Sequence, residues 1–147
     1  MKNFRLIVAA LAMGLALNSC SSDDDNSNSE ASIVGKWNFA TEKYYINNNL
    51  EYQGPYEENE PGCAPDYLRI FDAGNVDQGD YSGAECTLDV SSGYYTRSGN
   101  TLTLVEDLGN MVTLEIVSVT SNTLVLKNTY EYDGDTEVSE ITFSKAQ

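Results

Sequence analysis

From Ile33 onward the chain alternates between apolar and polar residues with a period of two, and this pattern constrains the fold more than any other feature. The clearest runs are residues 101–105, 112–116, 123–126 and 138–143. Successive side chains of a strand point to opposite faces of a sheet, so short alternating runs indicate half-buried antiparallel strands. No run in this part of the sequence has the period of an amphipathic helix.

Turn-forming residues separate the runs at nearly regular intervals. They are Ser98-Gly99-Asn100, Leu108-Gly109-Asn110, Ser121-Asn122 and Asp133-Gly134-Asp135. We count about eight strands, which fits a small barrel or a sandwich. The Gly- and Asn-rich residues 46–62 are the least regular, and we expect a long connection at one rim there.

Residues 1–19 have the features of a secretory signal peptide. Lys2 and Arg5 precede an uncharged apolar run, residues 6–17, which is shorter than the ~20 residues that a membrane-spanning helix needs. A buried N-terminal helix is the alternative, but residues 21–32 show no core pattern after it.

The end of this leader, Leu17-Asn18-Ser19-Cys20, resembles the lipobox of bacterial lipoproteins. The resemblance implies cleavage before Cys20 and a diacylglycerol attached to its thiol as a thioether. Ser21-Ser22 and the three aspartates that follow look like the export signal of surface lipoproteins in Bacteroidota. We therefore expect a lipid anchor in the outer membrane and exposure at the cell surface. Residues 20–32 also read as a disordered acidic tether, because polar acidic runs do not fold.

Charge limits the partners. The formal net charge is −15, and loss of Lys2 and Arg5 with the leader makes it about −17. Such a charge disfavours nucleic acid and bare anionic membranes, so we expect membrane contact only through the lipid. We expect a soluble, monomeric domain at residues 33–147, which have the size of one domain.

Cys63 and Cys86 remain once Cys20 is assigned to lipid. An even pair in a secreted protein favours a disulfide, which would stabilise the fold by roughly 3 kcal/mol. Two free thiols and a two-thiolate metal site completed by carboxylates are the alternatives. A Cys/His zinc site is excluded because the chain has no histidine.

The sequence carries no constellation for catalysis. Histidine is absent, no Gly-x-Ser-x-Gly elbow occurs, and the acidic residues stand in predicted loops and turns. We expect neither an enzyme nor a cofactor. The best cation candidate is a calcium loop with the oxygen ligands Asp72, Asn75, Asp77 and Asp80. Its spacing does not match an EF-hand, and a hairpin turn accounts for the same residues, so we assign no metal.

Val34-Gly35-Lys36-Trp37 resembles the Gly-x-Trp signature of lipocalins. Residues 94–104 and 118–128 look like the repeats of lipocalin-like lipoproteins from Bacteroidota, and the resemblance covers residues 33–145. It implies an all-β fold, a small antiparallel up-and-down barrel of about eight strands. Trp37 would then plug the narrow end, with Gly35 allowing close approach. Lipocalins carry an arginine over that tryptophan near the last strand, and this chain offers Lys145 there.

Two functions of different classes fit this barrel. The first is binding of a small apolar ligand in a cavity inside the barrel. The residues at the inward-facing strand positions would line it, namely Leu102, Leu104, Val112, Leu114, Ile116, Leu124 and Leu126. In the second, the same residues fill the interior. The protein is then a non-catalytic interaction or structural lipoprotein that contacts a protein or glycan through rim loops 47–62 and 72–80.

Overall fold

The structure is a computed structural model that describes residues 32–106 and 109–147. The predicted signal peptide, Cys20 and the tether up to residue 31 lie outside the described residues. The described part forms the strands β1 (Gly35–Ile46), β2 (Asn49–Pro55), β3 (Tyr67–Ile70), β4 (Asn75–Ser82), β5 (Thr87–Ser98), β6 (Thr101–Glu106), β7 (Met111–Val119), β8 (Thr123–Tyr132) and β9 (Asp135–Lys145). It includes no helix that is long and apolar enough to cross a membrane.

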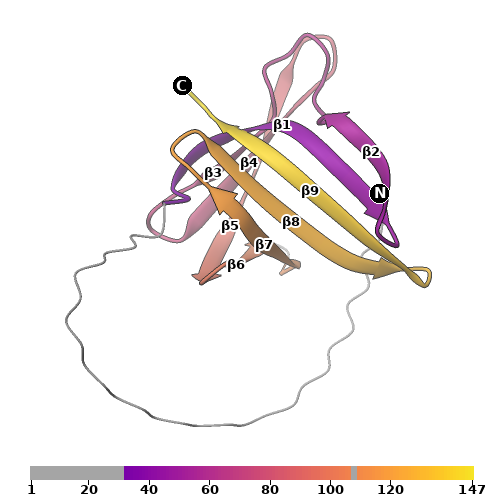
Figure 1. Ribbon diagram of the computed structural model, residues 1–147. Helices are drawn as coiled ribbons and strands as arrows, with labels where there is room; N and C mark the ends of the chain where they lie inside the picture. The colour runs from indigo at the N-terminus through magenta and orange to yellow at the C-terminus, as the bar shows by residue number, and fades with distance from the viewer. Residues whose placement is uncertain (1–31, 107–108) are drawn as a thin grey trace, which may run out of the picture.

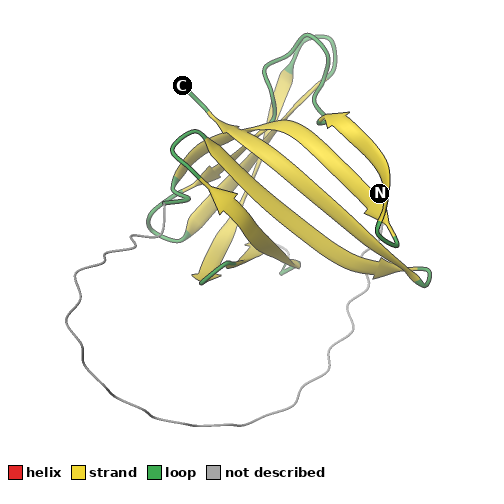
Figure 2. Cartoon of the chain, viewed as in Figure 1, coloured by secondary structure: helices red, strands yellow, loops and turns green. Residues whose placement is uncertain are grey.

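The strands close into an antiparallel barrel (Figure 1). Each strand from β3 to β9 pairs with the next one in sequence, and β9 pairs back onto β1. On its other side β1 pairs first with β3 and then with β2. Together, β2 and β3 therefore fill one position of an eight-strand barrel. Figure 2 shows strands and loops only in the described part, which confirms the predicted fold class.

One expectation about the rim is wrong. Residues 46–62 were expected to form a long irregular connection, but β2 occupies Asn49–Pro55 within them. Most side chains of β2 are exposed, so the apolar alternation that marks strands such as β6 and β8 is absent. The strand forms because Asn47 and Asn48, with φ of 49° and 65°, make a tight turn that returns the chain along β1.

The interruption between β2 and β3 is held together by side-chain hydrogen bonds. Asn59 donates from Nδ2 to the Phe39 carbonyl oxygen (3.0 Å) and accepts from the Asp66 N–H at Oδ1 (2.9 Å). The Phe39 N–H donates to the Asp66 carbonyl oxygen (2.9 Å). These bonds satisfy backbone groups of β1 that have no strand partner at this point.

Cys63 and Cys86 form a disulfide, with their Cα atoms 5.4 Å apart. The bond joins the segment between β2 and β3 to the turn between β4 and β5. The predicted pairing is confirmed, and the free-thiol and metal alternatives are wrong.

The core lies toward the end of the barrel at which β1 begins and β9 ends. Trp37, Ile70, Leu102 and Leu124 are its largest fully buried side chains. Around them pack Ile33, Phe39, Leu68, Val76, Ile116, Leu126 and Phe143. The turns that follow β3, β5 and β7 lie at this end too, because consecutive strands of the barrel run in opposite directions. We call it the closed end, and the end with the β1–β2, β4–β5 and β8–β9 turns the open end.

Candidate functional site

Trp37 is fully buried near the start of β1, at the closed end of the barrel. Its side chain has no exposed surface, and its indole Nε1 donates to the Ile33 carbonyl oxygen (2.7 Å). The Lys145 ammonium lies 4.0 Å from the centroid of the indole ring and donates to the Val34 carbonyl oxygen (2.8 Å). A lysine thus takes the place over the tryptophan where lipocalins carry an arginine.

Gly35 makes this arrangement possible. Its backbone has a φ of 137°, which residues with a Cβ rarely adopt. A Cβ at this position would lie 2.0 Å from Lys145 Nζ. The Gly-x-Trp spacing therefore leaves room for the cation that covers Trp37.

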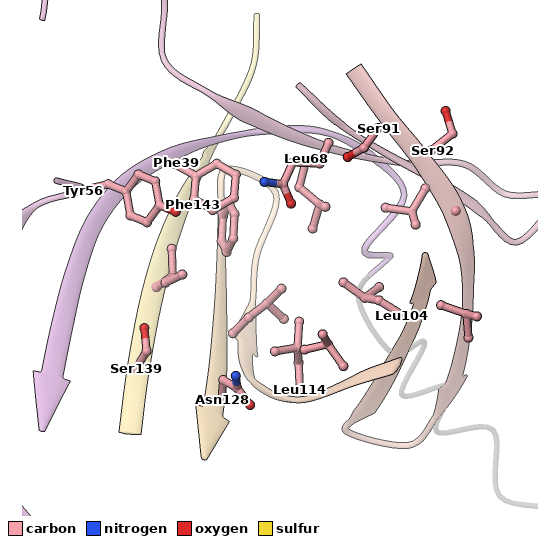
Figure 3. A pocket seen from close by; sticks show the side chains of 17 residues that line it. Phe39, Tyr56, Leu68, Ser91, Ser92, Leu104, Leu114, Asn128, Ser139 and Phe143 are labelled. Atoms are coloured by element: carbon pink, nitrogen blue, oxygen red, sulfur yellow. The ribbon is translucent and has the colours of Figure 1, made fainter. Parts of the chain in front are cut away.

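Beyond the packed core the barrel contains a cavity of about 230 Å³ (Figure 3). Its wall is mainly apolar, with Phe39, Leu68, Val76, Leu104, Val105, Val112, Leu114, Leu126, Ile141 and Phe143. Tyr56 packs against Phe39 with ring centroids 4.5 Å apart and completes one side. The remaining lining residues are Gln78, Ser91, Ser92, Gly93, Asn128 and Ser139.

The predicted lining divides into two groups. Leu104, Val112, Leu114 and Leu126 line the cavity. Leu102, Ile116 and Leu124 instead belong to the buried core near Trp37, so their assignment to the lining is wrong. Parity along a strand gives the face of each residue, but not its height between the two ends of the barrel.

The sequence interpretation missed the contributions of the other strands. Phe39 on β1 and Phe143 on β9 lie opposite each other in register, and their ring centroids are 4.6 Å apart. Asn128 and Ser139 are also opposite each other, on β8 and β9, and Figure 3 shows both at one end of the cavity. Polar residues at inward positions break the apolar alternation, so hydrophobicity alone could not place them.

Toward the open end, carboxylates accept hydrogen bonds from the inner wall. The Ser139 hydroxyl donates to Glu42 Oε1 (2.7 Å), and the Tyr44 hydroxyl donates to Glu137 Oε2. The hydrogen bond to Glu137 raises the pKa of Tyr44, so this phenol stays protonated as a donor. Burial, and then its hydrogen bond with Glu137, raises the pKa of Tyr130 as well.

The candidate calcium ligands do not converge. Asp77 accepts from the Ser92 hydroxyl (2.8 Å), whereas Asp80, three residues further along β4, accepts from Gln78 Nε2 (3.0 Å). Residues three apart on a strand point to opposite faces, so these two carboxylates cannot share an ion. The described residues hold no group of three or more His, Cys, Asp or Glu that could hold a metal.

The predicted hairpin turn is found between β3 and β4. The Phe71 N–H donates to the Asn75 carbonyl oxygen (3.0 Å) and the Gly74 N–H to the Phe71 carbonyl oxygen (3.3 Å). Residues 75–80, expected in a rim loop, belong to β4.

The fold and the cavity define a lipocalin-like barrel, and the comparisons agree. Residues 33–126 match the family described as Lipocalin-like domain, and the chain belongs to this family. A search of curated proteins gives no match.

Solved structures share the fold at low sequence identity. A lipocalin-like protein from Bacteroides uniformis has a TM-score of 0.53 at 13% identity, with 77% of this chain and 97% of that chain covered. An uncharacterized protein from Bacteroides eggerthii has a TM-score of 0.53 at 11% identity, covering 77% and 98%. H1 crustacyanin from the lobster Homarus americanus has a TM-score of 0.50 at 17% identity, covering 82% and 64%.

Proposed function

We propose that the protein is a membrane-anchored surface lipoprotein whose lipocalin-like barrel binds a small apolar ligand. The cavity of about 230 Å³ carries the proposal, because a filled barrel would leave no such space. Members of this family, which are typically non-enzymatic, use the barrel to bind small hydrophobic ligands. Pockets for drug-sized ligands measure ~300–1,000 Å³, so the ligand is smaller than those.

Blocking the cavity tests the binding function. The experiment uses the chain from residue 20 onward, with Cys20→Ser to prevent lipidation. Titration calorimetry measures its affinity for 1-octanol. Leu114→Trp places a larger side chain on the cavity wall, and we expect octanol affinity to fall at least ~10-fold. Leu88→Trp is the matched control, because Leu88 is 42% exposed and does not line the cavity.

The outcomes separate clearly when both variants unfold cooperatively. Octanol binding that Leu114→Trp abolishes and Leu88→Trp preserves supports a cavity ligand. Equal binding by both variants places octanol elsewhere and contradicts the proposal. Absence of octanol binding to the parent protein contradicts the proposal and favours the alternative, a lipoprotein that contacts a partner through its rim loops.

The anchoring part of the proposal rests on residues 17–25, with Cys20 as the lipidated residue. Cells fed an alkyne-bearing fatty acid should label the parent chain and leave Cys20→Ser unlabelled. Changing Asp23, Asp24 and Asp25 to Ala should keep the label, and protease added to intact cells should then no longer digest the protein. Labelling of Cys20→Ser would refute the anchor, and unchanged digestion would refute the export signal.

A further inference from the structure

The cavity has no positively charged residue in its lining, which is apolar or neutral throughout. The described lysines and arginines are Lys36, Lys43, Arg69, Arg97, Lys127 and Lys145. Lys36, Arg69 and Lys145 lie over the rings of Tyr67, Phe71 and Trp37 respectively. Lys43 pairs with Glu140 and Lys127 with Glu115, and Arg97 donates to the Gly99 carbonyl oxygen. None of these partners lines the cavity, so a bound anion would find no cation there.

Carboxylates, in contrast, stand on the inner face next to the cavity. Directly opposed residues of antiparallel strands share a face. Glu42 is opposite the cavity residue Ile141, so its side chain lies on the inner face. Glu137 is two residues from the cavity residue Ser139 on β9 and shares its face.

Strand β4, which is separated from β1 by the position that β2 and β3 share, repeats this order. Gln78 on β4 lines the cavity, and Asp80, two residues further toward the β4–β5 turn, lies on the same face. Strand β9 therefore places Ser139 at the cavity and Glu137 closer to the open end, and β4 does the same with Gln78 and Asp80. Glu42 on β1 lies level with the cavity residue Ile141.

The hydrogen bonds orient the polar lining residues. Ser139 has one hydroxyl proton and donates it to Glu42 Oε1 (2.7 Å), so only acceptor capacity remains on its oxygen. Gln78 directs its Nε2 to Asp80 Oδ1 (3.0 Å), which leaves its Oε1 as an acceptor. Asn128 can orient its side-chain carbonyl oxygen to accept a hydrogen bond from the ligand. A donor group of a ligand therefore meets oxygen acceptors here, and at Ser139 and Gln78 a carboxylate lies directly behind them.

We infer that the ligand is a small amphipathic amine, with its apolar body against the cavity wall and its ammonium group toward Glu42 and Glu137. The inference rests on the proposed binding function and specifies the ligand's head group. An ammonium group donates three hydrogen bonds and is attracted by both carboxylates. A carboxylate head group would lack donors and be repelled, so the same arrangement discriminates against fatty acids.

Three probes with one tail test the head group. Octylammonium, 1-octanol and octanoate are titrated calorimetrically at pH 7 into the chain from residue 20 with Cys20→Ser. We expect octylammonium to bind at least ~10-fold more tightly than octanoate, with octanol between them. The ratio should fall in 0.5 M salt, because screening weakens the carboxylate field.

Charge variants localise the effect. Glu42→Gln and Glu137→Gln should each reduce the ratio of octylammonium affinity to octanol affinity several-fold. Glu140→Gln is the matched control, since it removes the same charge from β9 but pairs with Lys43 (3.0 Å) on the other face. It should leave the preference intact.

Each result decides the matter. Octanoate that binds as tightly as octylammonium, or an equal effect of Glu42→Gln and Glu140→Gln, overturns the inference. Octanol binding under those results still supports the apolar cavity. Failure of all three probes to bind overturns both the inference and the proposed function.

Discussion

At the scale of single residues, the contact between Lys145 and Trp37 links the last strand of the barrel to the first. The ammonium group lies over the indole and is bonded to the Val34 carbonyl oxygen, while Gly35 leaves the space it occupies. A cation over a buried aromatic ring contributes about 0.5–2 kcal/mol, and the hydrogen bond adds to this. The C-terminal strand is thereby fixed to the start of the first.

We expect Lys145→Met to lower the free energy of unfolding by about 1–3 kcal/mol, because the cation–π contact and the bond to Val34 are both lost. Urea unfolding monitored by tryptophan fluorescence measures the change. Lys145→Arg is the control and should stay close to the parent protein, since a guanidinium can make both contacts. Equal stability of Lys145→Met and the parent would show that Lys145 does not hold the closed end.

Asp66 is a second residue with a measurable signature. It is 3% exposed, and its Oδ1 accepts from the Tyr81 N–H (2.6 Å). Burial raises the pKa of Asp66 above its usual value, with the hydrogen bond from Tyr81 opposing the shift. The folded state therefore keeps this proton to higher pH than the unfolded state.

The sign of the pH effect follows. A carboxyl whose pKa is raised on folding costs no stability below its ordinary pKa of about 3.8, and the cost grows as pH rises through the folded value. Asp66→Asn keeps an acceptor for Tyr81 but does not ionise. We expect its stability relative to the parent protein to increase between pH 4 and pH 7 in urea unfolding. A difference that is constant with pH would contradict this account.

At the scale of elements, the split strand β2/β3 is the least regular part of the barrel. The Cys63–Cys86 bond ties the segment between these strands to the β4–β5 turn. We expect replacement of both cysteines by Ala to lower the free energy of unfolding by roughly 3 kcal/mol, through the freedom gained by the unfolded chain. Urea unfolding measures the loss, and Cys20→Ser serves as the control background. If the free energy of unfolding falls by less than ~0.5 kcal/mol, the disulfide does not stabilise the fold by restricting the unfolded chain.

The elements differ in how well the sequence predicts them. Strands with one buried face, such as β6 and β8, are evident from their alternation. The exposed strand β2 is not, because backbone pairing to β1 and the Asn47-Asn48 turn create it without an apolar pattern. The pair Asn47-Asn48 was the available signal, since both residues tolerate positive φ.

At the scale of the whole molecule, the barrel combines a packed end with a hollow one. Period-two patterning predicts the inner face, but a residue's height in the barrel depends on strand register and tilt. For this reason Leu102 and Leu104 are both predicted to line the cavity, but only Leu104 does so. Leu102 lies in the packed core. The polar residues Asn128 and Ser139 join the lining only because β8 and β9 bring them opposite each other.

The central claim is that this cavity carries a small ligand, and native mass spectrometry tests it most directly. The chain from residue 20 with Cys20→Ser is purified without detergent, measured under native conditions and measured again after denaturation. We expect a discrete extra mass that denaturation removes, present in the parent protein and in Leu88→Trp but missing from Leu114→Trp. A bare mass that persists after incubation with an extract of the cell envelope would contradict the claim and favour a protein that acts through its surface.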